Sequence, residues 1–220
     1  MDQDTVYDGY VEQHAPGRFL AFLADLPGCV ARASSESAAI AALTAAIPGY
    51  FDWLRAHDEY TPVVHGPFRV APVSSVVVPA GHQGEFYPFD VQPVPDDDLD
   101  WRLAILEWTF DDLARLSGIG DAPTNNGAST GDILRAVVGT HLWLLSRLDG
   151  QPPSVSREEL TRAPAEQLRQ IARASVARLR RVSDEERQRV YERDGERWSL
   201  RKVLRCGVLN ARGALTALEG

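Results

Sequence analysis

Histidine and cysteine are the side chains best suited to bind a transition metal, because zinc and nickel favour imidazole nitrogen and thiolate sulfur. The chain has five histidines and two cysteines. No histidine lies four residues from another, and Cys29 and Cys206 are far apart, so neither a helical His pair nor a C-x-x-C motif is present. This pattern predicts no metal site, no cofactor and no disulfide framework.

His141 is the histidine best placed to reach an interior site. It shares a helical stripe with apolar residues spaced three and four apart, which puts them on one helix face. These residues are Ile133, Val137, Leu144 and Leu148. We interpret His141 as a core histidine hydrogen-bonded to a neighbour such as Asn210 or Thr140; the alternative is a pocket residue in an internal cavity.

The stretch 198–218 predicts a C-terminal helix with a second inward stripe, made of Val203, Gly207, Asn210, Ala214 and Ala217. Asn210 is polar within that stripe, and a buried Asn can fix the register of packed helices. Gly207 suggests close packing against Trp143 or Trp108. A metal site made of His141, Cys206 and Asn210 is conceivable, but these residues do not follow the spacing of a known metal-binding motif. Cys206 is interpreted as a small buried apolar group. A pocket would use His141, Asn210, Cys206 and Trp143.

The charge and composition exclude several classes of protein. The net charge is −8, which disfavours non-specific nucleic-acid binding. The arginines of 169–181 form a basic face on one predicted helix, and such a face is usually solvated. No run of about 18 apolar residues predicts a membrane span, and the acidic start lacks the order of a signal peptide. We therefore expect a cytoplasmic protein without nucleic-acid or membrane partners.

The first part of the chain predicts a small αβ domain over residues 1–78. Strands are expected at 5–11, 18–24 and 29–33, with a hairpin turn at 15–17 and one or two further strands within 67–78. Ser34 or Ser35 caps a helix that runs to about His57. Pro48 lies inside that helix and predicts a kink or a break.

The remainder predicts a docked linker over 79–96 followed by a helical domain over 97–220. Helices are expected at 97–117, 129–148, 165–182 and 198–218, with Ser129 or Thr130 capping the second and 183–195 as a connection. Four amphipathic helices of similar length are typical of a four-helix bundle. The fold class is therefore α+β.

The residues from Phe19 to Ala33, with the sequence Asp25-Leu-Pro-Gly-Cys29 and the Ser-rich cap after it, resemble the HicB-like fold. HicB proteins are antitoxin partners, and the same module also occurs alone or fused. This chain lacks the DNA-binding segment that antitoxins often carry after the module.

The stretches 133–148 and 194–205 resemble the DinB-like superfamily of four-helix bundles. That resemblance implies a divalent metal held by three histidines, one in the second helix and two in the fourth as H-x-x-x-H. In this sequence the three positions fall at Ala136, Asn210 and Ala214. None of these residues is a good ligand for zinc or nickel, and residues 198–220 contain no histidine.

The resemblance implies three alternative functions. The first is a non-catalytic, metal-free binding or interaction protein with a small-molecule ligand at the former metal position. The second is a thiol-dependent transferase with an atypical metal or none. The third is an antitoxin-like regulatory partner that uses the exposed edge of the small sheet. Because DinB-like bundles often dimerise, the resemblance also implies a homodimer.

Overall fold

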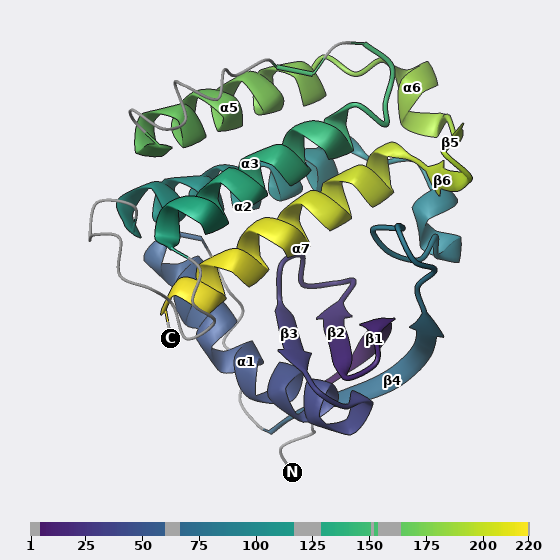
Figure 1. The fold of residues 1–220 in the computed structure, drawn as a ribbon, viewed down its shortest axis with the longest axis vertical. Helices are drawn as coiled ribbons and strands as arrows, with labels where there is room; N and C mark the ends of the chain where they lie inside the picture. The colour runs from purple at the N-terminus through teal and green to yellow at the C-terminus, as the bar shows by residue number, and fades with distance from the viewer. Residues whose placement is uncertain (1–4, 60–66, 117–128, 151, 154–163, 220) are drawn as a thin grey trace. The chain divides into compact units, whose positions relative to one another are not determined.

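The computed structural model describes residues 5–59, 67–116, 129–150, 152–153 and 164–219, and its fold is α+β (Figure 1). The chain divides into two compact units, residues 1–85 and 86–220. The division falls between Glu85 and Phe86, inside the segment 79–96 that the sequence assigned to a linker. The first unit contains a four-stranded sheet and the second contains most of the helices.

The N-terminal unit is a sheet with strand order β3-β2-β1-β4, covered by one helix. Its elements are β1 (Thr5–Ala15), β2 (Arg18–Leu23), β3 (Val30–Ala33), α1 (Glu36–Ala56) and β4 (Phe68–Val77). The strands β1, β2 and β3 pair antiparallel, and Gly17 in the β1–β2 turn has a φ of 69°. The predicted hairpin is therefore confirmed. β4 lies parallel to β1, and α1 packs against all four strands.

The sequence predicted one or two strands within residues 67–78. The structure has one strand there, β4, and it lies at an edge of the sheet. Pro72 lies within it, at the place where the register with β1 shifts between Gly9 and Tyr10. Because proline cannot donate a ladder hydrogen bond, an edge strand with a bulge is where a sheet tolerates it.

Helix α1 begins where the sequence predicts and continues through Pro48. The Ser35 hydroxyl accepts a hydrogen bond from the amide of Ala38 at 3.2 Å, which confirms the predicted cap. The sequence predicted a kink or a break at Pro48, and of these the break is wrong, because α1 is one helix from Glu36 to Ala56. Pro48 is exposed, so water can hydrate the carbonyl that loses its amide partner.

The C-terminal unit is organised around four helices. They are α2 (Asp96–Leu116), α3 (Thr130–Leu145), α5 (Pro164–Leu179) and α7 (Leu200–Glu219). Both α2 and α3 pack against α5 and α7, so each helix has two neighbours, as in a four-helix bundle (Figure 1). The Ser129 hydroxyl accepts from the amide of Asp132 at 3.1 Å and caps α3 as predicted.

Four short elements complete this unit: η1 (Pro88–Val91), α6 (Asp184–Gln188), β5 (Tyr191–Arg193) and β6 (Glu196–Trp198). β5 and β6 pair as a hairpin. Asp194 and Gly195 form its turn with φ values of 54° and 76°, the two positive values that a tight two-residue turn requires. The interpretation of 183–195 as a connection therefore missed α6 and β5.

Helix α7 is buried on every side from Lys202 to Leu209. The sequence predicted a single buried stripe on this helix, and its last member, Ala217, is exposed. The difference arises because α2, α3, α6 and η1 all pack on α7. Among the described residues, no helix combines the length and the apolarity needed to cross a bilayer.

Candidate functional site

His141 lies in the interior of the C-terminal unit and is 4% exposed. Its ring meets the Phe110 ring edge-on with centroids 5.2 Å apart. Neither ring nitrogen has a hydrogen-bond partner in the described part of the chain, so the predicted hydrogen bond to Asn210 or Thr140 is not formed. Burial lowers the pKa of His141 from 6.5 to about 4, which keeps the imidazole neutral at pH 7.

The glycine opposite His141 has room for a side chain. A Cβ on Gly207 would lie 3.5 Å from His141 Nδ1 and 4.0 Å from a Leu144 methyl, which are ordinary contact distances. The sequence had suggested that Gly207 packs closely against Trp143 or Trp108. Its nearest neighbours are His141 and Leu144 instead.

The three positions that the DinB-like resemblance assigns to metal ligands differ in burial. Asn210 and Ala214 are half-buried on α7, and Asn210 Nδ2 is enclosed without a hydrogen-bond partner in the described part of the chain. Ala136 is exposed on α3. It lies five positions before His141 on the same helix, which corresponds to a rotation of about 140° at 3.6 residues per turn. Ala136 therefore faces solvent and is not brought beside His141.

Cys206 and Trp143 belong to the packed core. Cys206 is 7% exposed and lies in the same buried cluster as Leu144 and Trp198. The Trp143 ring meets the Trp198 ring edge-on with centroids 5.4 Å apart, and the Arg147 guanidinium lies 4.5 Å from the Trp143 centroid. Neither cysteine forms a disulfide. These contacts give Cys206 and Trp143 a packing role.

The residues present do not fit the metal that the resemblance implies. In the parts of the chain that the structure describes, no three His, Cys, Asp or Glu side chains gather closely enough to hold a metal ion. His141 is the one imidazole in the described helices of the C-terminal unit. The side chains at Asn210 and Ala214 offer no second or third imidazole.

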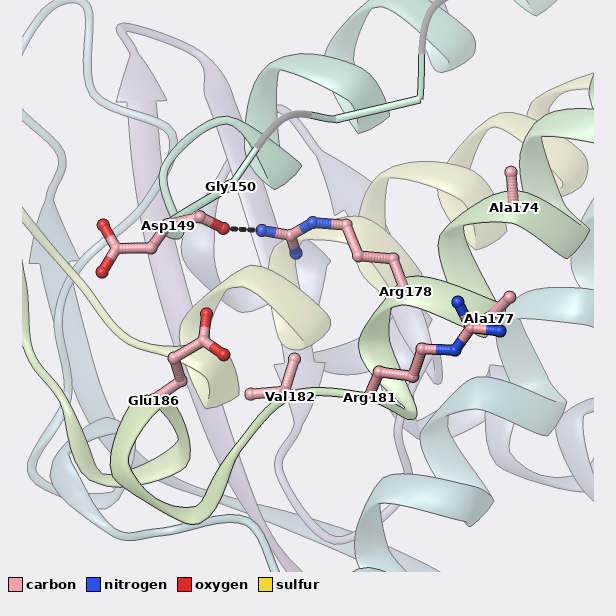
Figure 2. A pocket seen from close by; sticks show the side chains of 8 residues that line it. All are labelled: Asp149, Gly150, Ala174, Ala177, Arg178, Arg181, Val182 and Glu186. Atoms are coloured by element: carbon pink, nitrogen blue, oxygen red, sulfur yellow. Dashed lines mark hydrogen bonds between the residues drawn. The ribbon is translucent and has the colours of Figure 1, made fainter.

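A pocket of about 390 Å³ lies elsewhere in this unit, between the segment after α3, the C-terminal part of α5 with the residues that follow it, and α6 (Figure 2). None of its lining residues belongs to the set that the sequence predicted. They are Asp149, Gly150, Ala174, Ala177, Arg178, Arg181, Val182 and Glu186. Arg178 and Arg181 come from the helix face that the sequence analysis interpreted as solvated.

Charged contacts fix one wall of this pocket. Arg178 Nη2 donates a hydrogen bond to the backbone oxygen of Asp149, which joins α5 to the segment after α3 (Figure 2). The Asp149 carboxylate accepts from Arg189 Nη1 at 2.7 Å and from Arg193 Nη2 at 3.2 Å. Sequence reasoning missed this wall because its partners are 29 to 44 residues apart in the chain.

Comparison of the chain with family models, with curated proteins and with solved structures gave no match.

Proposed function

We propose that this chain is a non-catalytic, metal-free binding protein of DinB-like type, with a HicB-like module before the helical domain. One observation carries the proposal: the positions that would hold three imidazoles are an exposed alanine, a half-buried asparagine and a half-buried alanine. The mutual packing of α2, α3, α5 and α7 supports a helical domain of that kind.

The surroundings of His141 also favour binding over catalysis. A general base needs a pKa near the working pH and a partner that orients it. His141 has a pKa of about 4 and no hydrogen-bond partner among the described residues. The Cys206 thiol lies in a cluster of buried apolar side chains, which gives it a packing role.

The metal content of the purified full-length protein tests this proposal. The protein would be expressed with zinc, nickel and iron supplied, purified without a chelator or a histidine tag, and measured by elemental mass spectrometry. We expect far less than one metal ion per chain. One tightly held ion per chain, lost on substitution His141→Leu, would overturn the proposal and favour an enzyme with an atypical metal.

The double variant Asn210→His/Ala214→His is the positive control. It places two imidazoles four residues apart on one face of α7, the spacing with which a helix binds zinc. The variant should therefore take up zinc in the same assay in which the parent chain takes up none.

A further inference from the structure

β4 is the outermost strand of the N-terminal sheet, and one of its two sides has no strand beside it (Figure 1). β1 pairs with the inner side, and among the residues that the structure describes no strand pairs with the other. None of the residues of β4 is buried, and the side chains of Val73 and Val77 are 50% and 73% exposed. The outer side of β4 is therefore accessible to an added strand.

The hydrogen bonds to β1 fix which backbone groups of β4 face outward. Val78, the residue after β4, donates its amide to the backbone oxygen of Gln13 at 3.0 Å, and Val77 is the register partner of Gln13. In a β-strand, the N–H and C=O groups of successive residues point to opposite sides. Val76 therefore directs its backbone groups to β1, as Val78 does, and Ser75 and Val77 direct theirs away from the sheet.

The second half of β4 lacks the features that usually protect an edge strand. Native edges are blunted by charged side chains, by proline or by a bulge. Pro72 and the register shift beside it come before this stretch, and residues 73–78, Val-Ser-Ser-Val-Val-Val, contain no charge and no proline. The Ser75 hydroxyl donates to Glu36 of the same chain at 2.8 Å. At Ser75 the groups that a second strand can bind are therefore those of the backbone.

We propose that two copies of this chain pair antiparallel through β4, about a two-fold axis at Val76. This register sets Ser75 of each copy opposite Val77 of the other, and each such pair exchanges both N–H···O bonds. The two Val76 side chains meet across the axis as a non-hydrogen-bonded pair, in which side chains lie closest. A second copy fits this edge because self-pairing of an uncharged stretch opposes no like charges and closes with the commonest oligomer symmetry. This inference goes beyond the proposed binding function.

Sedimentation velocity of the full-length protein over a range of concentrations tests the pairing. We expect a reversible equilibrium between monomer and dimer. Val77→Pro should weaken dimerisation about tenfold or more, because each copy loses an outward amide that the second copy binds. The variant keeps its hydrogen bonds to β1, so its circular dichroism should match that of the parent chain. A parent chain that stays monomeric at every concentration would overturn the inference.

Val77→Ser is the matched control, because it removes the exposed apolar side chain and keeps the amide. It should dimerise more strongly than Val77→Pro. Equal weakening by the two substitutions would show that the copies meet through side chains and not through strand pairing. A dimer that Val77→Pro leaves unchanged would place the contact elsewhere, such as the helical domain. Either result would overturn the inference.

Cysteine cross-linking tests the register of the two strands. In the proposed pairing the two Cα atoms of residue 76 lie about 4.5 Å apart, within reach of a disulfide, whereas those of residue 73 lie about 20 Å apart at 3.3 Å per residue. Mild oxidation should therefore link Val76→Cys into a covalent dimer and leave Val73→Cys unlinked, although Val73 is the more exposed. The parent chain, whose two cysteines are buried, gives the background. Equal cross-linking of the two variants, or of neither, would contradict this register and overturn the inference.

Discussion

Arg205 on α7 and Asp90 in η1 form a doubly hydrogen-bonded ion pair inside the C-terminal unit. Arg205 Nη2 lies 2.8 Å from Asp90 Oδ2 and Arg205 Nε lies 3.3 Å from Asp90 Oδ1, and both side chains are buried. Asp90 Oδ2 also accepts from the amide of Tyr87 at 3.0 Å, and the Asp90 backbone oxygen accepts from Ser199 Oγ at 2.6 Å. The hydrogen bonds of Asp90 therefore connect η1 to the N-terminal part of α7 and to Ser199, which precedes it.

Asp90→Ala should lower the free energy of unfolding by about 3–5 kcal/mol, because it leaves the buried Arg205 charge without this carboxylate. Urea unfolding followed by circular dichroism would measure the change. Asp100→Ala is the control, since Asp100 is 68% exposed and pairs with Arg180 at the surface; it should change stability by less than about 1 kcal/mol. Equal effects of the two substitutions would contradict a structural role for Asp90.

A second buried ion pair holds the β5–β6 hairpin on α7. Lys202 Nζ lies 2.7 Å from Glu196 Oε1 and 4.4 Å from the centroid of the Trp198 ring, and Lys202 is fully buried. Lys202→Met should destabilise the protein by about 3–5 kcal/mol, because the Glu196 carboxylate then stays buried without its ammonium partner.

The double variant Lys202→Met/Glu196→Gln separates the ion pair from packing. It should recover part of the lost stability, since it removes the unpaired charge while keeping the side-chain volume. A thermal unfolding cycle over the parent, the two single variants and the double variant measures the coupling. Additive effects of the two substitutions would show that the pair does not act as a unit.

His141 should make stability depend on pH in a defined window. Its folded pKa of about 4 lies below the ordinary value of 6.5, so between these values the unfolded chain binds a proton that the folded chain does not. The stability that the neutral His141 contributes to the folded state is fully present above pH 6.5 and is lost as the pH falls toward 4. From pH 7 to pH 5 we expect a loss of about 2 kcal/mol from this group.

His141→Leu should remove that part of the pH dependence. It should also leave stability at pH 7 unchanged or higher, because it replaces two unpartnered ring nitrogens with apolar atoms. Urea unfolding at pH 7 and pH 5 measures both effects, with His82→Gln as a histidine control outside the C-terminal unit. A parent and a His141→Leu variant that lose equal stability between the two pH values would count against the buried, neutral imidazole.

Local signals in the sequence located the helices well. The sequence gave two candidate caps for each of two helices, and one of each pair, Ser35 and Ser129, forms the capping hydrogen bond. The candidates could be found in the sequence because this bond depends on neighbouring residues alone. The Asp194-Gly195 pair carried an equally local signal for a hairpin turn. It was missed because β5 and β6 are short and the stretch is rich in charges.

The candidate site was less accessible to sequence reasoning because its parts meet only in three dimensions. The arginines on α5 look like a solvated face in the sequence, and the Asp149 backbone oxygen that holds Arg178 leaves no trace in a residue pattern. For Ala136, in contrast, the sequence predicted a place in the site that the structure does not give it. An alignment of motifs placed it at an interior ligand position, yet its helical phase relative to His141 puts it on the exposed side of α3.

Gly207 is the residue where sequence and structure lead to opposite predictions. A glycine within a helix suggests that a side chain would collide, but a Cβ at 207 meets only ordinary contacts at 3.5 Å and beyond. Gly207→Ala should therefore stabilise the protein by up to about 1 kcal/mol, the difference in helix propensity. Gly207→Leu should destabilise it, because its larger side chain must displace His141 or Leu144. Thermal unfolding of the two variants measures whether each substitution raises or lowers the stability of the protein. A Gly207→Ala variant that is less stable than the parent would mean that α3 and α7 pack more closely here than these distances allow.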